Sequence, residues 1–151
     1  MPLPLPGTLL TRAERERIHA KIRDTCSVSL MSDVKWRKLV SIVQTIPSID
    51  HYFLKSIRSP VDLPGHGYIS GNAPHAFIDT FSFGPIYLRA IEWLEFPRLV
   101  IQRANGATPT GGHHQDIDEL ARALGAAGKF PIEETSRGLR IVGHLRAGPL
   151  S

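Results

Sequence analysis

The stretch Tyr87-Leu-Arg-Ala-Ile-Glu-Trp-Leu-Glu-Phe96 decides the fold prediction more than any other part of the chain. Side chains alternate between the two faces of a β-strand. With that alternation, Ile86, Leu88, Ala90, Leu94 and Phe96 share one face with Glu92, and Tyr87, Ile91 and Trp93 share the other with Arg89 and Glu95. Apolar residues on both faces are typical of a strand that is covered on both sides. The stretch therefore predicts a sheet at the centre of the fold, with Glu92 as its acidic residue of greatest interest.

Length and composition indicate one globular domain. The chain has 151 residues, of which 42% are hydrophobic and 21% charged, as in a soluble protein with a sizeable core. We expect an extended, proline-rich arm at residues 1–10 and a single α+β domain over residues 11–151. No apolar run approaches the roughly 18 residues of a membrane span, and the N-terminus lacks the features of a secretory signal. The single cysteine, Cys26, excludes an internal disulfide and suits a reducing compartment, so we expect a cytoplasmic protein.

The basic excess lies in the first third of the chain. Residues 1–58 carry ten Lys/Arg and five Asp/Glu, whereas residues 59–151 carry eight and nine. Such an excess favours nucleic acid, an anionic membrane surface or an acidic protein as a partner. The basic residues Arg15, Arg17 and Lys21 alternate with acidic residues at helical spacing, however, which is typical of a solvated helix face.

Two helices are expected before the strands. The capping-box pair of Thr11 and Glu14 predicts a helix that continues to about Thr25. Its apolar stripe is thin, so we expect it to dock on a partner instead of on its own core. A second, strongly amphipathic helix is predicted over residues 33–46, where Trp36, Leu39, Val40 and Val43 recur at helical spacing after the N-cap Ser32.

After Pro47 the hydrophobic period changes from 3.6 to 2. Strands are expected at residues 51–58, 67–70, 76–83, 87–96 and 99–102, with loops at residues 59–66 and 104–112. Links this short indicate an antiparallel meander. A third helix over residues 116–124, ended by Gly125, and a hairpin of residues 130–135 with 139–145 complete the chain. This order predicts a single α+β domain with a mostly antiparallel sheet, two N-terminal helices and one later helix.

The two acids of the opening stretch are interpreted differently. Burial would raise the pKa of Glu92 and suit it to acid catalysis, but a carboxylate in such a setting more often pairs with a basic side chain. No second acid lies at a suggestive position, so we expect a structural role for Glu92. Glu95 lies nearer the end of the strand and is expected to be solvated.

The segment His113-His114-x-Asp116 resembles a corner of a metal site, with His66 and His75 as candidate further ligands. Metal sites need three or four ligands that converge, and adjacent histidines point in different directions. We therefore expect a polar helix entrance here, and neither a metal nor another cofactor.

Other catalytic and binding motifs are missing from the sequence. It contains no Gly-x-Ser-x-Gly element and no phosphate-binding loop. Cys26 is expected to be partly buried packing. The segment Lys35-Trp-Arg-Lys38 mixes an aromatic residue with basic ones, as nucleic-acid binders do, but Trp36 lies on the apolar stripe. Nucleic acid is therefore not an expected partner.

Several short blocks together resemble a known family. They are Ser32-Asp-Val-Lys-Trp-Arg-Lys-Leu39, Gly67-Tyr-Ile-Ser70, Ile91-Glu-Trp-Leu-Glu95, Pro131-Ile-Glu-Glu134 and Leu139-Arg-Ile-Val-Gly143. In this order they resemble a bacterial family of small proteins classed as a domain of unknown function, over about residues 30–145. That family is similar in size and layout to immunity proteins of bacterial toxin systems. The resemblance implies no catalytic residues.

The sequence thus favours a non-enzymatic protein-binding module, in the form of an immunity protein that neutralises a cognate bacterial toxin by direct binding. The expected partner is a protein, not a membrane. Candidate contact residues are Arg15, Arg17, Lys21, His66, His113 and His114, on the first helix and the loops at residues 59–66 and 104–114. Two alternatives stay open: a small metal-dependent or acid–base hydrolase that uses Glu92 and loop histidines, and a nucleic-acid-binding protein that uses the basic N-terminal third.

Overall fold

A computed structural model describes residues 10–71, 73, 76–103 and 109–147. Within these residues the helices are α1 (Arg12–Thr25), α2 (Asp33–Gln44) and α3 (Ile117–Ala127), with a 3₁₀ turn η1 (Leu88–Ala90). The strands are β1 (Cys26–Ser29), β2 (His51–Ser56), β3 (Leu63–His66), β4 (Ile69–Ser70), β5 (Phe77–Thr80), β6 (Gly84–Tyr87), β7 (Ile91–Pro97), β8 (Leu99–Arg103), β9 (Pro109–His114), β10 (Ile132–Glu134), β11 (Gly138–Val142) and β12 (His144–Arg146). All their pairings are antiparallel. The predicted α+β domain is confirmed.

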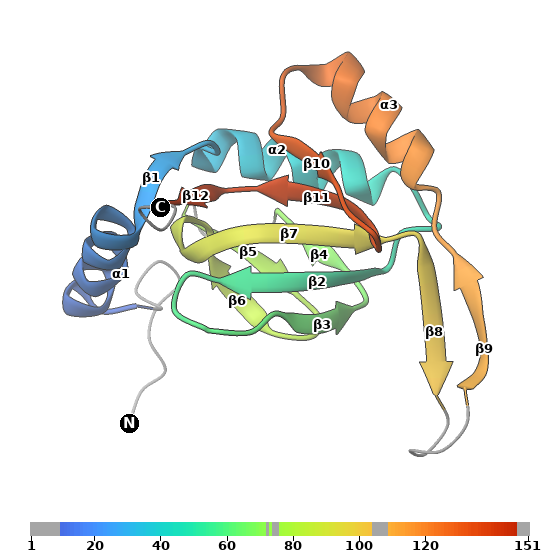
Figure 1. The fold of residues 1–151 in the computed structure, drawn as a ribbon, viewed down its shortest axis with the longest axis horizontal. Helices are drawn as coiled ribbons and strands as arrows, with labels where there is room; N and C mark the ends of the chain where they lie inside the picture. Colours follow the sequence, from blue (N-terminus) through green and yellow to red (C-terminus); the bar gives the residue numbers. More distant parts are fainter. Residues whose placement is uncertain (1–9, 72, 74–75, 104–108, 148–151) are drawn as a thin grey trace.

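Strand β7 lies at the centre of a five-stranded sheet of order β10-β11-β7-β2-β3. Leu54, Leu94 and Ile141 stand side by side across three of these strands and face the main core. Helix α2 and the smaller sheet β4-β5-β6 lie behind the central sheet, and α3 lies above it (Figure 1). The predicted stripe of α2 is buried in this core, where Trp36 is only 1% exposed.

The stretch from Tyr87 to Phe96 is not one strand, as the sequence predicted. Tyr87 ends β6, which pairs with β5 in the smaller sheet; η1 then turns the chain into β7. Buried apolar residues occur in all three elements, so a run of them does not distinguish a long strand from two strands joined by a buried turn. The alternation also fails at Glu92, because Lys55 pairs with Trp93 and Ser56 with Ile91, which leaves Glu92 as the extra residue of a β-bulge.

The second face of the central sheet is covered by arginine side chains. The guanidinium of Arg137 lies 3.8 Å from the ring centre of Phe53, and that of Arg140 lies 3.9 Å from that of Trp93. Both arginines form ion pairs with Glu95, which is 0% exposed. The prediction that Glu95 is solvated was wrong, because the two arginines come from the turn before β11 and from β11 itself, far along the chain.

Three local predictions are corrected. Residues 63–66 form β3 and not a loop, because an edge strand tolerates a proline such as Pro64. Residues 109–112 belong to β9, whereas they were predicted to be part of a loop. Gly125 does not end α3, which continues to Ala127 and is capped at Gly128; one glycine costs a helix only about 1 kcal/mol, so packing overrides it.

Helix α1 docks on its own protein, contrary to the sequence prediction. Its capping box at Thr11 is present as predicted. Ile18 is 1% exposed and packs in a second core with Ile57, Phe77, Tyr87 and Ala90, against which the partly buried Cys26 also lies. The ring of His19 reaches the Tyr87 hydroxyl at 2.9 Å. The thin apolar stripe of α1 is enough to dock the helix, because this second core is small and needs few residues from it.

The predicted proline-rich arm lies outside the described residues, except for Leu10. No helix in the described part of the chain is long and apolar enough to cross a membrane.

Candidate functional site

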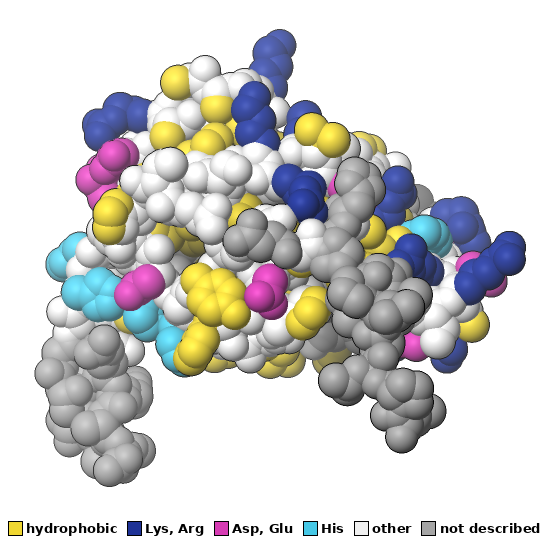
Figure 2. Space-filling view, turned by 180° about the vertical axis from the view of Figure 1, so that it is seen from behind, with side chains coloured by type: hydrophobic (Ala, Val, Ile, Leu, Met, Phe, Trp, Pro, Cys, Tyr) yellow, Lys and Arg dark blue, Asp and Glu magenta, His cyan; other side chains and the backbone are white. Residues whose placement is uncertain are grey.

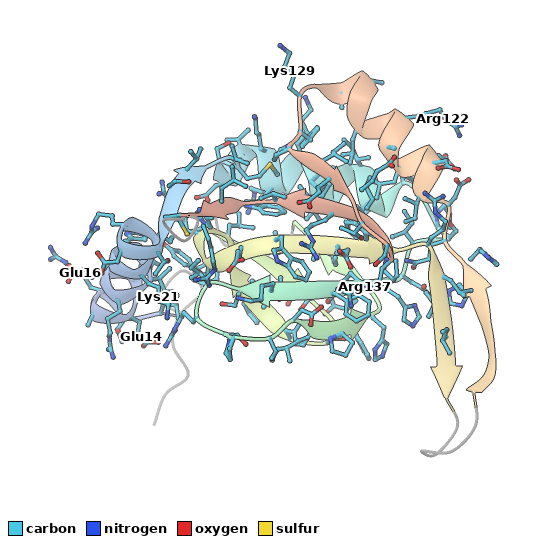
Figure 3. The ribbon with its side chains drawn as sticks, viewed as in Figure 1. Glu14, Glu16, Lys21, Arg122, Lys129 and Arg137 are labelled. Carbon is cyan, nitrogen blue, oxygen red and sulfur yellow. The ribbon has the colours of Figure 1, made fainter. Side chains whose placement is uncertain are left out.

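The candidate contact residues on α1 do not join the candidate histidines. The Arg15 guanidinium lies over the rings of Phe77 and Tyr87, at 5.7 and 5.4 Å from their centres, whereas Arg17 is exposed. Lys21 lines a cleft with Lys55, Arg58 and Arg146, here called the basic cleft. Figure 3 shows Lys21 at one end of the molecule, and Figure 1 shows that α1 and the β8–β9 hairpin lie at opposite ends. The sequence candidates therefore lie at two separate places.

The fold brings His66 and His113 to a pair of residues that the sequence did not single out, Asp50 and His51. The His51 ring stacks on that of His66, with 5.9 Å between the ring centres, and meets the His113 ring edge to face at 5.3 Å. Figure 2 shows histidine side chains gathered in one patch on this flank of the molecule. A turn before β2, the edge strand β3 and the end of β9 thus meet at one point.

Asp50 contacts two histidines of this cluster. Its Oδ1 atom lies 2.7 Å from His51 Nδ1 and 3.4 Å from His113 Nε2. Burial alone would raise the pKa of the Asp50 carboxyl, but the hydrogen bonds and charges of His51 and His113 lower it below its ordinary value. Asp50 is therefore an ionised acceptor that two imidazoles share.

Two sequence candidates stay outside the cluster. Asp116 is the N-cap of α3, where its carboxylate accepts a hydrogen bond from the Glu119 amide at 3.0 Å. His114 is exposed and lines a separate cleft beside Asp116. His75 lies outside the described residues. Of the segment His113-His114-x-Asp116, only His113 joins the cluster with Asp50, His51 and His66.

The buried side chain of Gln115 connects the backbone segments that carry the cluster. This side chain is 3% exposed. Its Oε1 atom accepts hydrogen bonds from the amides of Asp50 and His51, and its Nε2 atom donates to the carbonyls of His51 and Pro97. One amide side chain therefore fixes the segment with Asp50 and His51 to the segment with His113. The sequence offered no signal for this role, since Gln115 is an ordinary polar residue before a helix.

A family model described as a family of unknown function (DUF6678) matches residues 18–148. The chain belongs to this family. The predicted membership of a family of unknown function is confirmed, and the matched range contains the whole histidine cluster. No curated protein and no solved structure matches the chain.

In this member of the family, Glu92 is held by two cations. Its Oε1 atom lies 3.1 Å from Lys55 Nζ and 2.8 Å from Arg146 Nη2. Burial would raise the pKa of Glu92, but the hydrogen bonds and charges of Arg146 and Lys55 lower it. The raised pKa considered from the sequence is therefore wrong, and the predicted pairing with a basic side chain is confirmed. Lys55 and His51 lie at opposite ends of β2, so Glu92 and the histidines do not form one site.

The hairpin of β8 and β9 projects from the body of this family member (Figure 1). Leu99 and Ile101 share one side of β8 and are 47% and 57% exposed, whereas Val100 between them is buried. All three line a cleft of about 420 Å³, here called the hairpin cleft, together with Phe53, Pro64 and Arg137. His51 and Tyr52 line this cleft and also a second one of about 370 Å³. The histidine cluster thus lies at the foot of a hairpin that exposes Leu99 and Ile101.

Proposed function

We propose that this protein is a non-enzymatic binding module that recognises a partner protein through the hairpin cleft. The observation that carries the proposal is the exposure of Leu99 and Ile101 on a projecting two-stranded ribbon. An isolated ribbon of two strands is marginally stable in water, and adjacent exposed apolar side chains mark interaction surfaces. A partner that covers them would bury apolar area and stabilise the hairpin.

The cleft has the composition of an interface centre. Phe53, Pro64 and Val100 supply apolar surface, and Arg137 lines the cleft with its guanidinium over the Phe53 ring. Interfaces are enriched in aromatic residues and arginine at their energetic centres. These side chains fit an apolar anchor residue of the partner.

Charge favours a partner with an acidic surface. The formal net charge of the chain is +4, and the basic cleft adds a local concentration of cations. Opposite charge steers two proteins together and raises the association rate. The specific form that we propose is an immunity protein that covers the surface of a bacterial toxin. The compact α+β scaffold and the resemblance to such proteins expected from the sequence motivate this form of the proposal.

Coexpression with the product of an adjacent toxin gene tests this proposal. The wild-type protein should protect the cells and coelute with the toxin in size-exclusion chromatography. Replacement of Leu99 and Ile101 by aspartate should abolish both effects and leave the melting temperature nearly unchanged, because both side chains are exposed. The control is Val34→Asp on α2, which is 69% exposed and far from the cleft. Toxicity that persists with the wild-type protein, together with no complex, would refute the proposal.

One observation favours a nucleic-acid-binding function as the second candidate. The basic cleft, of about 320 Å³, is lined by Lys21, Lys55, Arg58 and Arg146, and of these Lys55 and Arg146 pair with Glu92. Phosphate contacts make affinity fall steeply with salt. Binding of a labelled oligonucleotide at low salt that weakens with added salt, and weakens further in Lys21→Ala/Arg58→Ala, would support it. No binding at low salt would exclude it.

A further inference from the structure

We propose that Asp50, His51 and His113 bind one divalent transition-metal ion of the zinc type, at the point where the β8–β9 hairpin meets the central sheet. Each of the three residues offers one ligand atom, and these atoms lie within 4.8 Å of one another. Asp50 Oδ1 is in contact with both His51 Nδ1 and His113 Nε2. This site goes beyond the proposed function and does not depend on it.

The distances suit tetrahedral coordination. Zinc binds histidine nitrogen and carboxylate oxygen at about 2.0–2.2 Å, which places neighbouring ligand atoms about 3.3–3.5 Å apart. Asp50 Oδ1 and His113 Nε2 are already 3.4 Å apart. Asp50 Oδ1 and His51 Nδ1 are 2.7 Å apart, a hydrogen-bond distance. Tetrahedral coordination needs about 0.6–0.8 Å more between these two atoms, which rotation of the exposed Asp50 carboxylate away from His51 would open.

The backbone segments that carry the ligands are held together without an ion. Gln115 binds the backbone amides of both Asp50 and His51 from a position two residues after His113. The backbone amide of Gln115 in turn donates to the Arg98 carbonyl, and this hydrogen bond fixes the foot of the hairpin. The two halves of the ligand set therefore cannot separate without breaking a buried hydrogen-bond network. Such support of ligands raises metal affinity.

The site is open on its outer side. The side chains of Asp50, His51 and His113 are 53%, 28% and 39% exposed. Three protein ligands with an accessible fourth position characterise zinc sites that hold a water or an external ligand. His51 also lines the hairpin cleft, so an ion bound here would lie beside that cleft.

The donor types decide the class of ion. Two imidazoles and one carboxylate suit Zn²⁺, Co²⁺, Ni²⁺ or Cu²⁺, whereas Mg²⁺ and Ca²⁺ prefer sets made of oxygen alone. The sequence pattern pointed to a different combination, because Asp50 and His51 are more than 60 residues from His113.

The test uses the full-length protein without a histidine tag, stripped with a chelator and titrated with ZnCl₂ in a calorimeter. We expect one ion per chain, no heat with MgCl₂, and a rise in melting temperature with ZnCl₂, since a ligand that binds only the folded state stabilises it. His113→Ala and Asp50→Asn should each weaken binding by about tenfold or more. CoCl₂ should give the intense visible absorption of a tetrahedral site in the wild type only.

His114→Ala is the matched control, because it removes the neighbouring exposed histidine of the same strand and leaves the three ligands in place. It should bind zinc as the wild type does. Circular dichroism confirms that each variant folds. Absence of stoichiometric binding by the wild type would overturn the proposal. Binding that survives in both His113→Ala and Asp50→Asn would overturn it equally, since the ion would then lie elsewhere.

Discussion

Gln115 binds the His51 peptide on both sides: its Oε1 atom accepts from the His51 amide at 2.8 Å, and its Nε2 atom donates to the His51 carbonyl at 3.0 Å. The amide side chain therefore acts as a short piece of β-ladder between β2 and the β9–α3 connection. All of its hydrogen bonds go to backbone groups of segments that are far apart in the chain.

Replacing Gln115 with alanine should lower the free energy of unfolding by about 3 kcal/mol, because several backbone groups lose their partner in a buried place. Urea denaturation followed by circular dichroism measures this loss. Gln44→Ala is the control, since Gln44 is exposed at the end of α2. If Gln115→Ala and Gln44→Ala lost the same free energy of unfolding, the side-chain hydrogen bonds of Gln115 would have no special role in stability.

Glu95→Gln should destabilise the protein by about 3 kcal/mol at neutral pH. The substitution keeps the shape of the side chain but leaves Arg137 and Arg140 without their buried counter-charge. Chemical denaturation again gives the measurement, with the exposed Glu134→Gln as the control. Equal stability of Glu95→Gln and the wild type would show that the arginines need only a polar partner.

Glu92 should make stability depend on pH. Its pKa in the folded state is lowered from an ordinary value of 4.5, so the ionised form stabilises the fold above about that pH, and the contribution is lost as the pH falls through the folded-state value. Glu92→Gln should therefore cost about 2 kcal/mol at pH 7 and progressively less in acid. Denaturation curves across this range test the trend. Glu16→Gln, in an exposed pair with Arg12, should change little at any pH.

Two glycines should respond to alanine in opposite directions. At Gly125, inside α3, nothing lies within 4 Å of an added Cβ atom, so alanine should stabilise the helix by about 0.5–1 kcal/mol. At Gly143 the same atom would overlap the Ile91 carbonyl oxygen and lie 3.0 Å from the Trp36 ring, so alanine should cost about 2 kcal/mol. Melting temperatures that rise for Gly125→Ala and fall for Gly143→Ala would agree with this packing.

The elements that the sequence predicted well are those whose signals are local. The capping box of Thr11 and Glu14 starts α1, and Ser32 caps α2 through the Lys35 amide. Each of these contacts joins residues three positions apart, so residue types and their spacing in the sequence are enough to predict it. The hairpin of β10 and β11 closes over a short turn for the same reason.

The positions that the sequence misjudged depend on distant partners. The bulge at Glu92 arises from the register between β2 and β7. Glu95 is buried only because Arg137 and Arg140, more than 40 residues later, cover it. The alternation of residues within one strand does not reveal which basic side chains from distant segments will cover it.

The sequence by itself determined the α+β class, the core stripe of α2 and the family of the chain, because helix periodicity and caps act between near neighbours. Tertiary structure alone decided the histidine cluster. Asp50 and His51 meet His113 through the fold. Gln115 fixes that meeting by accepting hydrogen bonds from the backbone amides of Asp50 and His51, which every residue type except proline carries. Contacts made to the backbone leave no trace in the identity of the partner residues, so they become visible only in three dimensions.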